Sequence, residues 1–314
     1  MLVDMNLTKS IKSKTMEIGF QKVGISSPDE SLLYNNYFNN WLASGKNGTM
    51  NWIERRTKER KDVNKYFPSV KSIISVGINY FTGTSDEIVG NGNKTHKFSN
   101  YAWGKDYHII VEQKLNELLK YIKAEYDEKI NGIICVDSSP IMEKQWAQRG
   151  GIGWQGKHTI VINDELGSWM FLGELLLDIP LDYDEPFTKD LCGSCTACIE
   201  ACPTQALSEY QLDATKCISY LTAEYKTEFD NNQKSNLSKW IYGCDICQQV
   251  CPWNKKKQKY TDDDSFKPIR EIEEYSRVDW LNVDDKTLKE IFKDSPVKRI
   301  KYNRFKRNIL ASNQ

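Results

Sequence analysis

Hydrophobic side chains recur along the first half of the chain at two alternating spacings, one typical of helices and one of strands. Residues 7–18 fit a helix that ends at Gly19, and residues 111–126 fit a longer amphipathic helix. Residues 72–80 and 131–136 are short runs rich in β-branched side chains, which predicts buried strands, and residues 159–162 and 168–177 predict two more. This alternation favours an α/β domain whose active site lies in loops at the strand ends.

One carboxylate stands at such a strand end. Asp137 follows the strand predicted at 131–136, and Ser139 and Pro140 come next, with proline suited to the first turn of a helix. Asp137 therefore has two interpretations, either as a group that acts on a substrate or as the N-terminal cap of that helix. The residues alone leave both open.

The pattern changes twice beyond this region. Residues 183–190 form a polar joint into a cysteine-rich block, and after Trp253 the chain becomes lysine-rich and then helical and polar to its end. We expect three parts, at residues 1–182, 183–258 and 259–314. No internal repeat appears beyond two cysteine runs.

Eight of the nine cysteines lie within residues 192–251. The run CGSCTACIEACP contains four and the run CDICQQVCP contains three, and their three-residue gap and closing Cys-Pro favour ligands of 4Fe–4S clusters over zinc. In two-cluster ferredoxins the last cysteine of each run ligates the other cluster. Cluster one thus takes Cys192, Cys195, Cys198 and Cys251. Cluster two takes Cys202, Cys244, Cys247 and, by counting, Cys217. Cys135 is interpreted as a buried strand thiol.

Composition narrows the class of protein. The 314 residues are 39% hydrophobic and 27% charged with a formal net charge of zero, which excludes general disorder and a uniformly basic surface. No apolar run approaches the roughly 20 residues of a membrane span, and the N-terminus lacks the apolar core of a signal peptide. We expect a cytosolic protein with no membrane partner, in which cysteines serve as ligands rather than disulfides.

Two further motifs are ambiguous. The segment RGGIGWQGKHT at 149–159 resembles a phosphate cradle but has neither the Walker nor the GxGxxG spacing, so we interpret it as a glycine-rich floor beneath a flat or bulky cofactor. The segment DYHIIV at 106–111 begins like a motif whose histidine ligates cobalt. It has Val111 where that motif needs glycine, so we place His108 at the head of the following helix.

Together these segments resemble the epoxyqueuosine reductase family. The resemblance covers nearly the whole chain and is carried by residues 101–108, 136–159, 192–207, 216–224 and 241–254. It implies a cobalamin-binding domain related to those of reductive dehalogenases, followed by a two-cluster ferredoxin-like domain. It also implies the last step of queuosine biosynthesis, in which cobalamin and two 4Fe–4S clusters reduce epoxyqueuosine at the wobble position of tRNA. Longer family members carry C-terminal helical repeats, which we do not expect in this chain.

The resemblance also assigns residues. Asp137 matches the family's proposed proton donor, a role for which its pKa would have to be raised by apolar surroundings or by the cofactor. Arg60 matches an arginine near the corrin. The other corrin contacts expected from matched segments are Tyr101, Lys157, His158, Ser168, Tyr242, Gly243 and Asp245. No protein histidine is expected as the lower ligand of cobalt.

The anticodon stem-loop should meet a local basic face, because the net charge is zero. Residues 295–307 carry six Lys/Arg and no acid, and from them we select Lys298, Arg299, Arg304 and Arg307, with lysines 255–257 as a second candidate. Tyr225 and Lys226 are expected at the anticodon loop, where unstacked bases meet aromatic side chains.

We further expect a monomer supplied by an external electron donor. Two alternatives stay open at this point. One is a reductive dehalogenase-like cobalamin enzyme acting on a small molecule, and the other is a non-enzymatic ferredoxin-like electron carrier without cobalamin.

Overall fold

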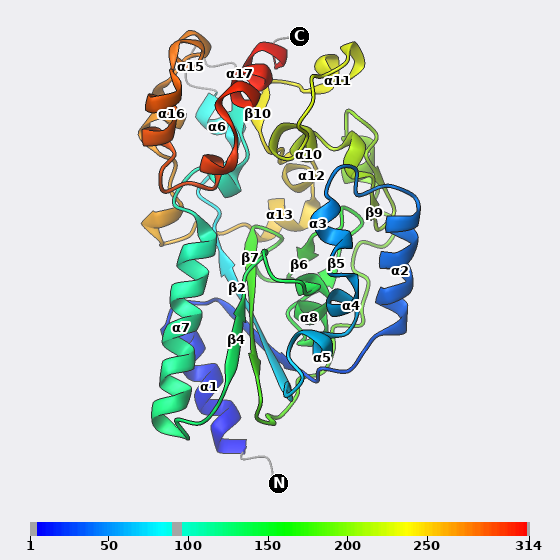
Figure 1. Ribbon diagram of the computed structural model, residues 1–314, viewed down its shortest axis with the longest axis vertical. Coiled ribbons are helices and arrows are strands. Elements are labelled where there is room, and N and C mark those ends of the chain that lie inside the picture. The colour runs from blue at the N-terminus through cyan, green and yellow to red at the C-terminus, as the bar shows by residue number, and fades with distance from the viewer. Residues whose placement is uncertain (1–4, 90–95, 313–314) are drawn as a thin grey trace.

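The computed structural model describes residues 5–89 and 96–312, and its centre is a four-stranded antiparallel sheet of order β1-β2-β7-β4 (Figure 1). β2 and β7 pair from Ser72 opposite Leu177 to Asn79 opposite Met170. The strands predicted at 72–80, 131–136 and 168–177 are confirmed, and their antiparallel pairing gives the α+β form of the expected class. The strands are β1 (Lys22–Ser26), β2 (Ser72–Asn79), β4 (Gly132–Cys135) and β7 (Met170–Leu177).

Helices cover both faces of this sheet (Figure 1). Because side chains alternate along a strand, Ile74 packs with Leu115 beneath α1 (Met5–Glu17) and α7 (Tyr107–Glu125), whereas Ile73 packs with Trp146 beneath α5 (Val63–Tyr66) and α8 (Glu143–Arg149). Both predicted helices are confirmed. The first ends just before Gly19, whose φ of 103° suits a residue without a side chain.

The loop between β4 and α8 differs from the prediction. The helix expected to open at Ser139 and Pro140 begins only at Glu143, with Met142 as its N-cap. The preceding residues form bends, and Ile141 is drawn into the core beside Trp146. Asp137 is therefore not a helix cap, and the capping alternative is wrong.

The cysteine-rich region consists of short elements. Its one strand that joins an earlier part of the chain is β10 (Trp240–Tyr242), which pairs in parallel with β3 (Lys97–Phe98). The other elements of this region are the hairpin β8 (Leu207–Ser208) with β9 (Gln211–Leu212), η2 (Ala214–Lys216), and helices α9 (Ala197–Glu200), α10 (Ile218–Ala223), α11 (Asn231–Asn236), α12 (Ile246–Gln249) and α13 (Pro252–Lys257). The hairpin of β5 (Trp154–Gln155) with β6 (Val161–Ile162) precedes the region.

The described part of the expected tail, residues 259–312, is helical as predicted but packs into the body of the protein. Trp280, Phe292 and Phe305 form a buried cluster with Phe98 of β3 and Ile241 of β10 (Figure 1). Their elements are η3 (Asp264–Phe266), α14 (Arg270–Glu274), α15 (Arg277–Asn282), α16 (Asp285–Ile291), η4 (Pro296–Arg299) and α17 (Tyr302–Ala311).

The remaining elements are α2 (Leu32–Ala43), α3 (Asn51–Glu54), α4 (Thr57–Lys61), α6 (Ser85–Val89) and η1 (Asn100–Ala102). Within residues 5–89 and 96–312, no helix combines the length and apolar character needed to cross a membrane.

Candidate active site and cysteine sets

Asp137 lines a cavity of about 580 Å³ and leaves 53% of its side chain exposed there. Its φ of 55° lies in the left-handed region, which costs a residue with a side chain of order 1 kcal/mol or more unless contacts hold it. Two such contacts are present. The Asp137 backbone N–H donates to Glu143 Oε1 at 2.5 Å, and the Tyr107 hydroxyl donates to Asp137 Oδ2 at 3.2 Å.

The first turn of α7 supplies the groups that face Asp137. Asp106 caps this helix, and its Oδ1 lies 2.7 Å from His108 Nδ1. The opposite ring nitrogen, His108 Nε2, lies 3.2 Å from Asp137 Oδ2. Tyr107 stacks on Phe171 of β7 with ring centroids 4.1 Å apart. Helix capping and ring stacking therefore direct both side chains at one carboxylate.

Hydrogen bonds determine which of Asp137 and His108 holds the proton between them. Burial by itself would raise the pKa of Asp137, but hydrogen bonds from His108 and Tyr107 outweigh it and the pKa lies below its usual value. Burial by itself would lower the pKa of His108, but Asp106 and Asp137 raise it above its usual value. The proton shared by His108 and Asp137 therefore resides mainly on His108. The raised pKa that a proton-donor role would require of Asp137 is not found.

Two more carboxyl groups lie behind the Asp137 loop. Burial, followed by the nearby Asp137 charge, raises the pKa of Glu143 to about 8. Glu174 on β7 is fully buried between its strand neighbours Ser75 and Cys135, and burial holds its pKa well above the usual range. Burial thus favours the uncharged, protonated form of both groups. Sequence reasoning missed Tyr107, His108 and Glu143, because their only local sign is a helix N-terminus.

The cavity beside Asp137 fits a large ligand with polar groups on its rim. Arg60 Nε and Gln145 Oε1 are buried there without hydrogen-bond partners. The Arg60 guanidinium lies 5.3 Å from the ring centre of Trp52, which is itself part of the lining. An apolar wall with a few unpaired polar atoms is typical of a cofactor site, and amides around a corrin would satisfy those atoms.

None of the other seven expected corrin residues lines this cavity, namely Tyr101, Lys157, His158, Ser168, Tyr242, Gly243 and Asp245. Ser168 is buried and accepts a hydrogen bond from Asn254, and buried Asp245 accepts one from the Asn100 backbone. These partners lie within the protein, so the structure gives no support to the corrin contacts expected of Ser168 and Asp245. The same correction applies to Lys157 and His158, because both line a separate cavity beside the first cysteine set.

Tyr101, Tyr242 and Gly243 lie together beneath the first turn of α7. Tyr101 has its ring centroid 6.5 Å from that of Tyr107, and the Tyr242 hydroxyl donates to the Pro296 carbonyl at 3.3 Å. Gly243 has a φ of 69°. These residues connect the cysteine-rich region with Tyr107 and thereby with Asp137.

The glycine-rich segment has a different role from the one expected. A Cβ at Gly153 would lie 2.0 Å from the Ile162 carbonyl oxygen, and a Cβ at Gly156 would lie 2.5 Å from the Ile162 side chain. These glycines therefore allow β5 and β6 to pack closely. The interpretation as a floor beneath a cofactor is wrong for these two glycines, whereas Gln155 and Thr159 of the same segment line the Asp137 cavity.

The structure brings the eight cysteines into two neighbouring sets. The first set lines one cavity of about 270 Å³ and consists of Cys192, Cys195, Cys198 and Cys251. The second set consists of Cys202, Cys217, Cys244 and Cys247, where burial and then neighbouring thiols raise the pKa of Cys217, Cys244 and Cys247. Trp154 Nε1 donates to Cys192 Sγ at 3.5 Å and the Ala206 backbone N–H donates to Cys202 Sγ at 3.3 Å. Such donors are typical of cluster thiolates. Cys135 is buried in the sheet, as expected.

The basic residues of the last segment divide into two groups. Arg307 is only 7% exposed and donates to the carbonyls of Tyr225 and Leu221, so the expectation that it meets a phosphate is wrong. Arg304 NH1 likewise donates to the Ala223 carbonyl at 3.3 Å. Lys298 and Arg299 are exposed but reach the α7 turn, with Lys298 Nζ 3.0 Å from Asp106 Oδ2.

Comparison with known family models matches two separate segments of the chain. Residues 60–138 match the family model described as epoxyqueuosine reductase QueG, DUF1730, and residues 191–254 match the model described as a 4Fe-4S double cluster binding domain. An epoxyqueuosine reductase from Prochlorococcus marinus is 42% identical over 309 residues, which cover 97% of this chain and 96% of that protein.

Solved structures are similar over almost all of this chain. A crystal structure of epoxyqueuosine reductase with an epoxyqueuosine-modified tRNA-Tyr stem loop is 28% identical, with a TM-score of 0.88 over 98% of this chain and 80% of that one. An epoxyqueuosine reductase from Bacillus subtilis, described with an aspartate catalytic loop swung out of the active site, is 27% identical with a TM-score of 0.85 over 98% of this chain and 81% of that one.

Proposed function

The chain belongs to the epoxyqueuosine reductase family, and on that premise we propose that it reduces epoxyqueuosine to queuosine in tRNA. The observation that carries the proposal is the hydrogen-bonded group of Asp137, Tyr107 and His108 beside the cavity that Asp137 lines, in a chain whose cysteines also gather in two sets. The reaction requires both parts. The epoxide takes up two electrons and two protons, its oxygen leaves as water, and a carbon–carbon double bond forms.

Cobalamin and two 4Fe–4S clusters are the cofactors of this enzyme. When bound, the corrin supplies a reducing cobalt at the epoxide and the clusters supply electrons. Arg60, Trp52 and Gln145 would hold the corrin, because they line the cavity and two of them present unpaired polar atoms. The two cysteine sets would hold the clusters.

The proton requirement falls on the first turn of α7 and the Asp137 loop. We propose that Asp137 passes a proton to the epoxide oxygen and that His108, hydrogen-bonded to it, holds that proton beforehand. Tyr107 orients the carboxylate through its 3.2 Å hydrogen bond, and Glu143 fixes the loop through the Asp137 backbone. The swung-out aspartate loop described for the Bacillus subtilis relative supports a loop that moves during turnover.

Recognition of tRNA is proposed on the same side as the α7 turn. The related structure with a tRNA stem loop supports a stem-loop substrate. Lys298 and Arg299 are exposed beside Asp106 and His108, so their charges lie where the backbone of a bound anticodon loop would pass. Exposed Lys226 and half-buried Tyr225 remain proposed contacts. We propose that the enzyme acts as a cytoplasmic monomer.

A bacterial strain without its own epoxyqueuosine reductase provides the test, because its tRNA retains epoxyqueuosine. Expression of this chain should replace that nucleoside by queuosine in hydrolysed tRNA, as measured by mass spectrometry. Retention of epoxyqueuosine by cells whose purified protein contains its full iron and cobalt would overturn the proposal.

A further inference from the structure

We propose that Lys255, Lys256 and Lys257 dock a small acidic one-electron carrier protein beside the first cysteine set. The proposal rests on the proposed function, which requires electrons from outside the protein. It adds the place where they enter and the chemistry of the partner. Three observations support it, namely the order of the cysteine sets, the unpaired lysines, and the separation of this face from the Asp137 cavity.

The two cysteine sets differ in how close they lie to the surface and to Asp137. Among the eight cysteines, Cys195 of the first set alone is exposed. Cys244 of the second set directly follows Gly243, where an added Cβ would lie 3.0 Å from the Tyr101 ring. Tyr101 in turn contacts Tyr107. The second set is thus the inner one. An external electron donor can therefore approach the first set more closely than the second.

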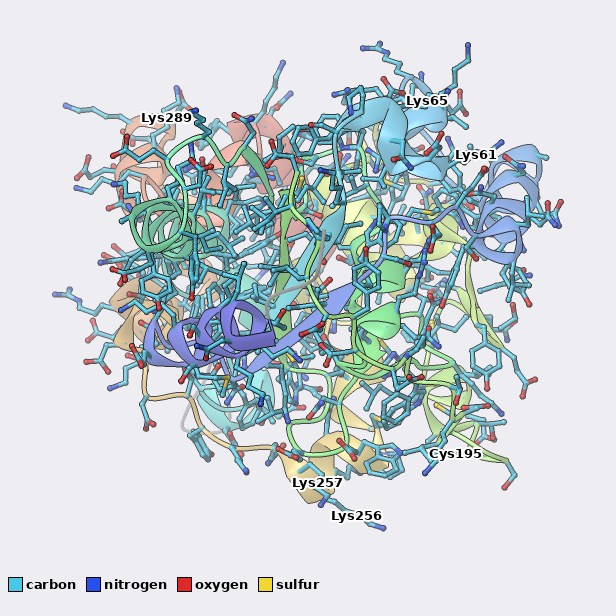
Figure 2. All side chains as sticks on the ribbon, turned by 90° about the horizontal axis from the view of Figure 1, so that it is seen from below. Lys61, Lys65, Cys195, Lys256, Lys257 and Lys289 are labelled. Carbon is cyan, nitrogen blue, oxygen red and sulfur yellow. The ribbon has the colours of Figure 1, made fainter. Side chains whose placement is uncertain are left out.

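Helix α13 places the three lysines beside the first cysteine set. The helix starts directly after Cys251, and its last turn presents Lys255, Lys256 and Lys257, all exposed. Lys256 lines the same cavity as Cys195. Figure 2 shows Cys195, Lys256 and Lys257 along one edge of the molecule. In the described part of the chain none of the three lysines forms an ion pair within 4.0 Å, whereas nearby Lys157 pairs with Glu209 at 2.6 Å.

The acidic side chains nearest the first set are already engaged by other groups. Asp190 accepts from the Cys192 backbone at 2.9 Å and from the Tyr210 hydroxyl, Glu209 pairs with Lys157, and Glu200 accepts from Thr196. The lysine charges on α13 consequently remain available to a partner. Unpaired charge of one sign beside a redox centre favours a partner of the opposite sign, and it accelerates the encounter of the two proteins.

A nucleic acid is the other polyanion that such lysines attract, but their position disfavours it. The substrate base has to reach Asp137, whose cavity shares no lining residue with the cavity at Cys195. Lys298 and Arg299 stand beside the Asp137 group, whereas α13 stands beside the electron entry. A protein electron carrier is therefore the partner that fits. Each docked carrier gives up one electron, so two encounters supply the two electrons that one epoxide takes up.

The test uses the reconstituted holoenzyme and a plant-type 2Fe–2S ferredoxin, an acidic one-electron carrier of low potential. The double variant Lys256→Glu/Lys257→Glu should slow reoxidation of reduced ferredoxin about tenfold or more at low salt, and should flatten its dependence on salt. Calorimetry with oxidised ferredoxin should show weaker binding by a similar factor. Reduction by dithionite should be unchanged, because that small ion does not need the lysines.

A matched control reverses the same number of charges elsewhere. Lys65 and Lys289 lie away from the edge that carries Cys195 and line no described cavity, so Lys65→Glu/Lys289→Glu should leave ferredoxin kinetics unchanged (Figure 2). Lys256→Arg/Lys257→Arg should behave as wild type, since charge is preserved. Equal ferredoxin rates and affinities in all variants would overturn the docking site, as would weaker stem-loop binding with normal ferredoxin binding. Dithionite-driven conversion of epoxyqueuosine tests the proposed function separately from either result.

Discussion

The Nε2 nitrogen of His108 lies 3.2 Å from the Oδ2 oxygen of Asp137. The same nitrogen lies 3.2 Å from NH2 of Arg299, which contributes only donors. A protonated imidazole can donate to the carboxylate but cannot accept from the guanidinium. Protonation of His108 therefore selects Asp137 as its partner, and loss of that proton frees the nitrogen to accept from Arg299.

This relationship predicts how the reaction rate depends on pH. The groups facing His108 are Asp106 on its own helix, Asp137 on the β4–α8 loop, with Glu143 behind it, and Arg299 of η4. Because the pKa of His108 is raised, its proton is present below that pKa and is lost as pH rises through it. The rate with excess chemical reductant should therefore fall as pH rises above the ordinary histidine value of about 6.5.

Replacing Asp106, a carboxylate partner of His108, should shift the pH at which the rate falls. Asp106→Asn removes a carboxylate that stabilises the charged imidazole, so the fall in rate should begin at lower pH than in the wild type. Asp285→Asn serves as the control, because it removes an exposed carboxylate paired with Lys289 and far from His108 in the fold. Coincident pH profiles for wild type and Asp106→Asn would contradict the role of His108 as proton carrier.

Glu143 provides a second prediction, because its carboxyl oxygen receives the Asp137 backbone N–H. Glu143→Gln keeps an acceptor oxygen and should retain most of the activity. Glu143→Ala removes this acceptor from the left-handed Asp137 backbone, which at about 1–3 kcal/mol corresponds to a roughly 5- to 150-fold loss of rate. Steady-state rates on a modified stem loop, with corrin content as control, measure both. A Gln variant as slow as the Ala variant would show that the carboxyl does more than position the loop.

The assignment of Cys217 to the second, inner cysteine set provides the third prediction. Cys217→Ala should damage that set and spare the outer one, so iron in the reconstituted protein should fall from about eight atoms to about four. Cys135→Ala, which changes a core thiol in the sheet, should leave iron unchanged. Full iron in the Cys217 variant would refute this assignment.

Arg307 gives the fourth prediction, because its guanidinium is surrounded by protein. It donates to backbone carbonyls and lies 3.8 Å from the ring centre of Phe229. Arg307→Gln should lower the free energy of unfolding by about 2–4 kcal/mol, since buried acceptors lose a charged donor. Lys301→Gln, at an exposed position in the same segment, should change it by about 0.5 kcal/mol or less. Denaturant titrations would show whether the two variants differ in this way.

Local patterns in the sequence were sufficient for part of this structure. The β-branched run at 72–80 and the helical spacing at 111–126 each specify one element, because the spacing of apolar side chains within a single segment indicates a strand or a helix. The cysteine spacing reflects ligands close together in the chain, which is why three-residue gaps indicated clusters before any fold was known. The position of Asp137 at a strand end was visible in the sequence, but its assignment as proton donor came from the family resemblance.

Other features depend on contacts between distant segments. Nothing near His108 in the sequence shows that its ring meets Asp137, 29 positions away, or Arg299, 191 positions away. Arg307 looks like a solvated cation until α17 packs against residues 221–227. The glycines at 153 and 156 suggest a cofactor, yet their Cβ positions are filled by the neighbouring strand. In each case packing between remote segments decides the role of the residue.

The central claim is that this chain reduces epoxyqueuosine with Asp137 as the group that passes the proton. The most direct measurement compares wild type and Asp137→Asn, reconstituted with cobalamin and iron, acting on an epoxyqueuosine-containing stem loop under anaerobic reduction. The wild type should form queuosine, seen as loss of one oxygen atom from the nucleoside mass. The variant should keep its iron and corrin but react about a hundredfold to ten-thousandfold more slowly. An undiminished rate in Asp137→Asn, or no queuosine from the fully loaded wild type, would contradict the account.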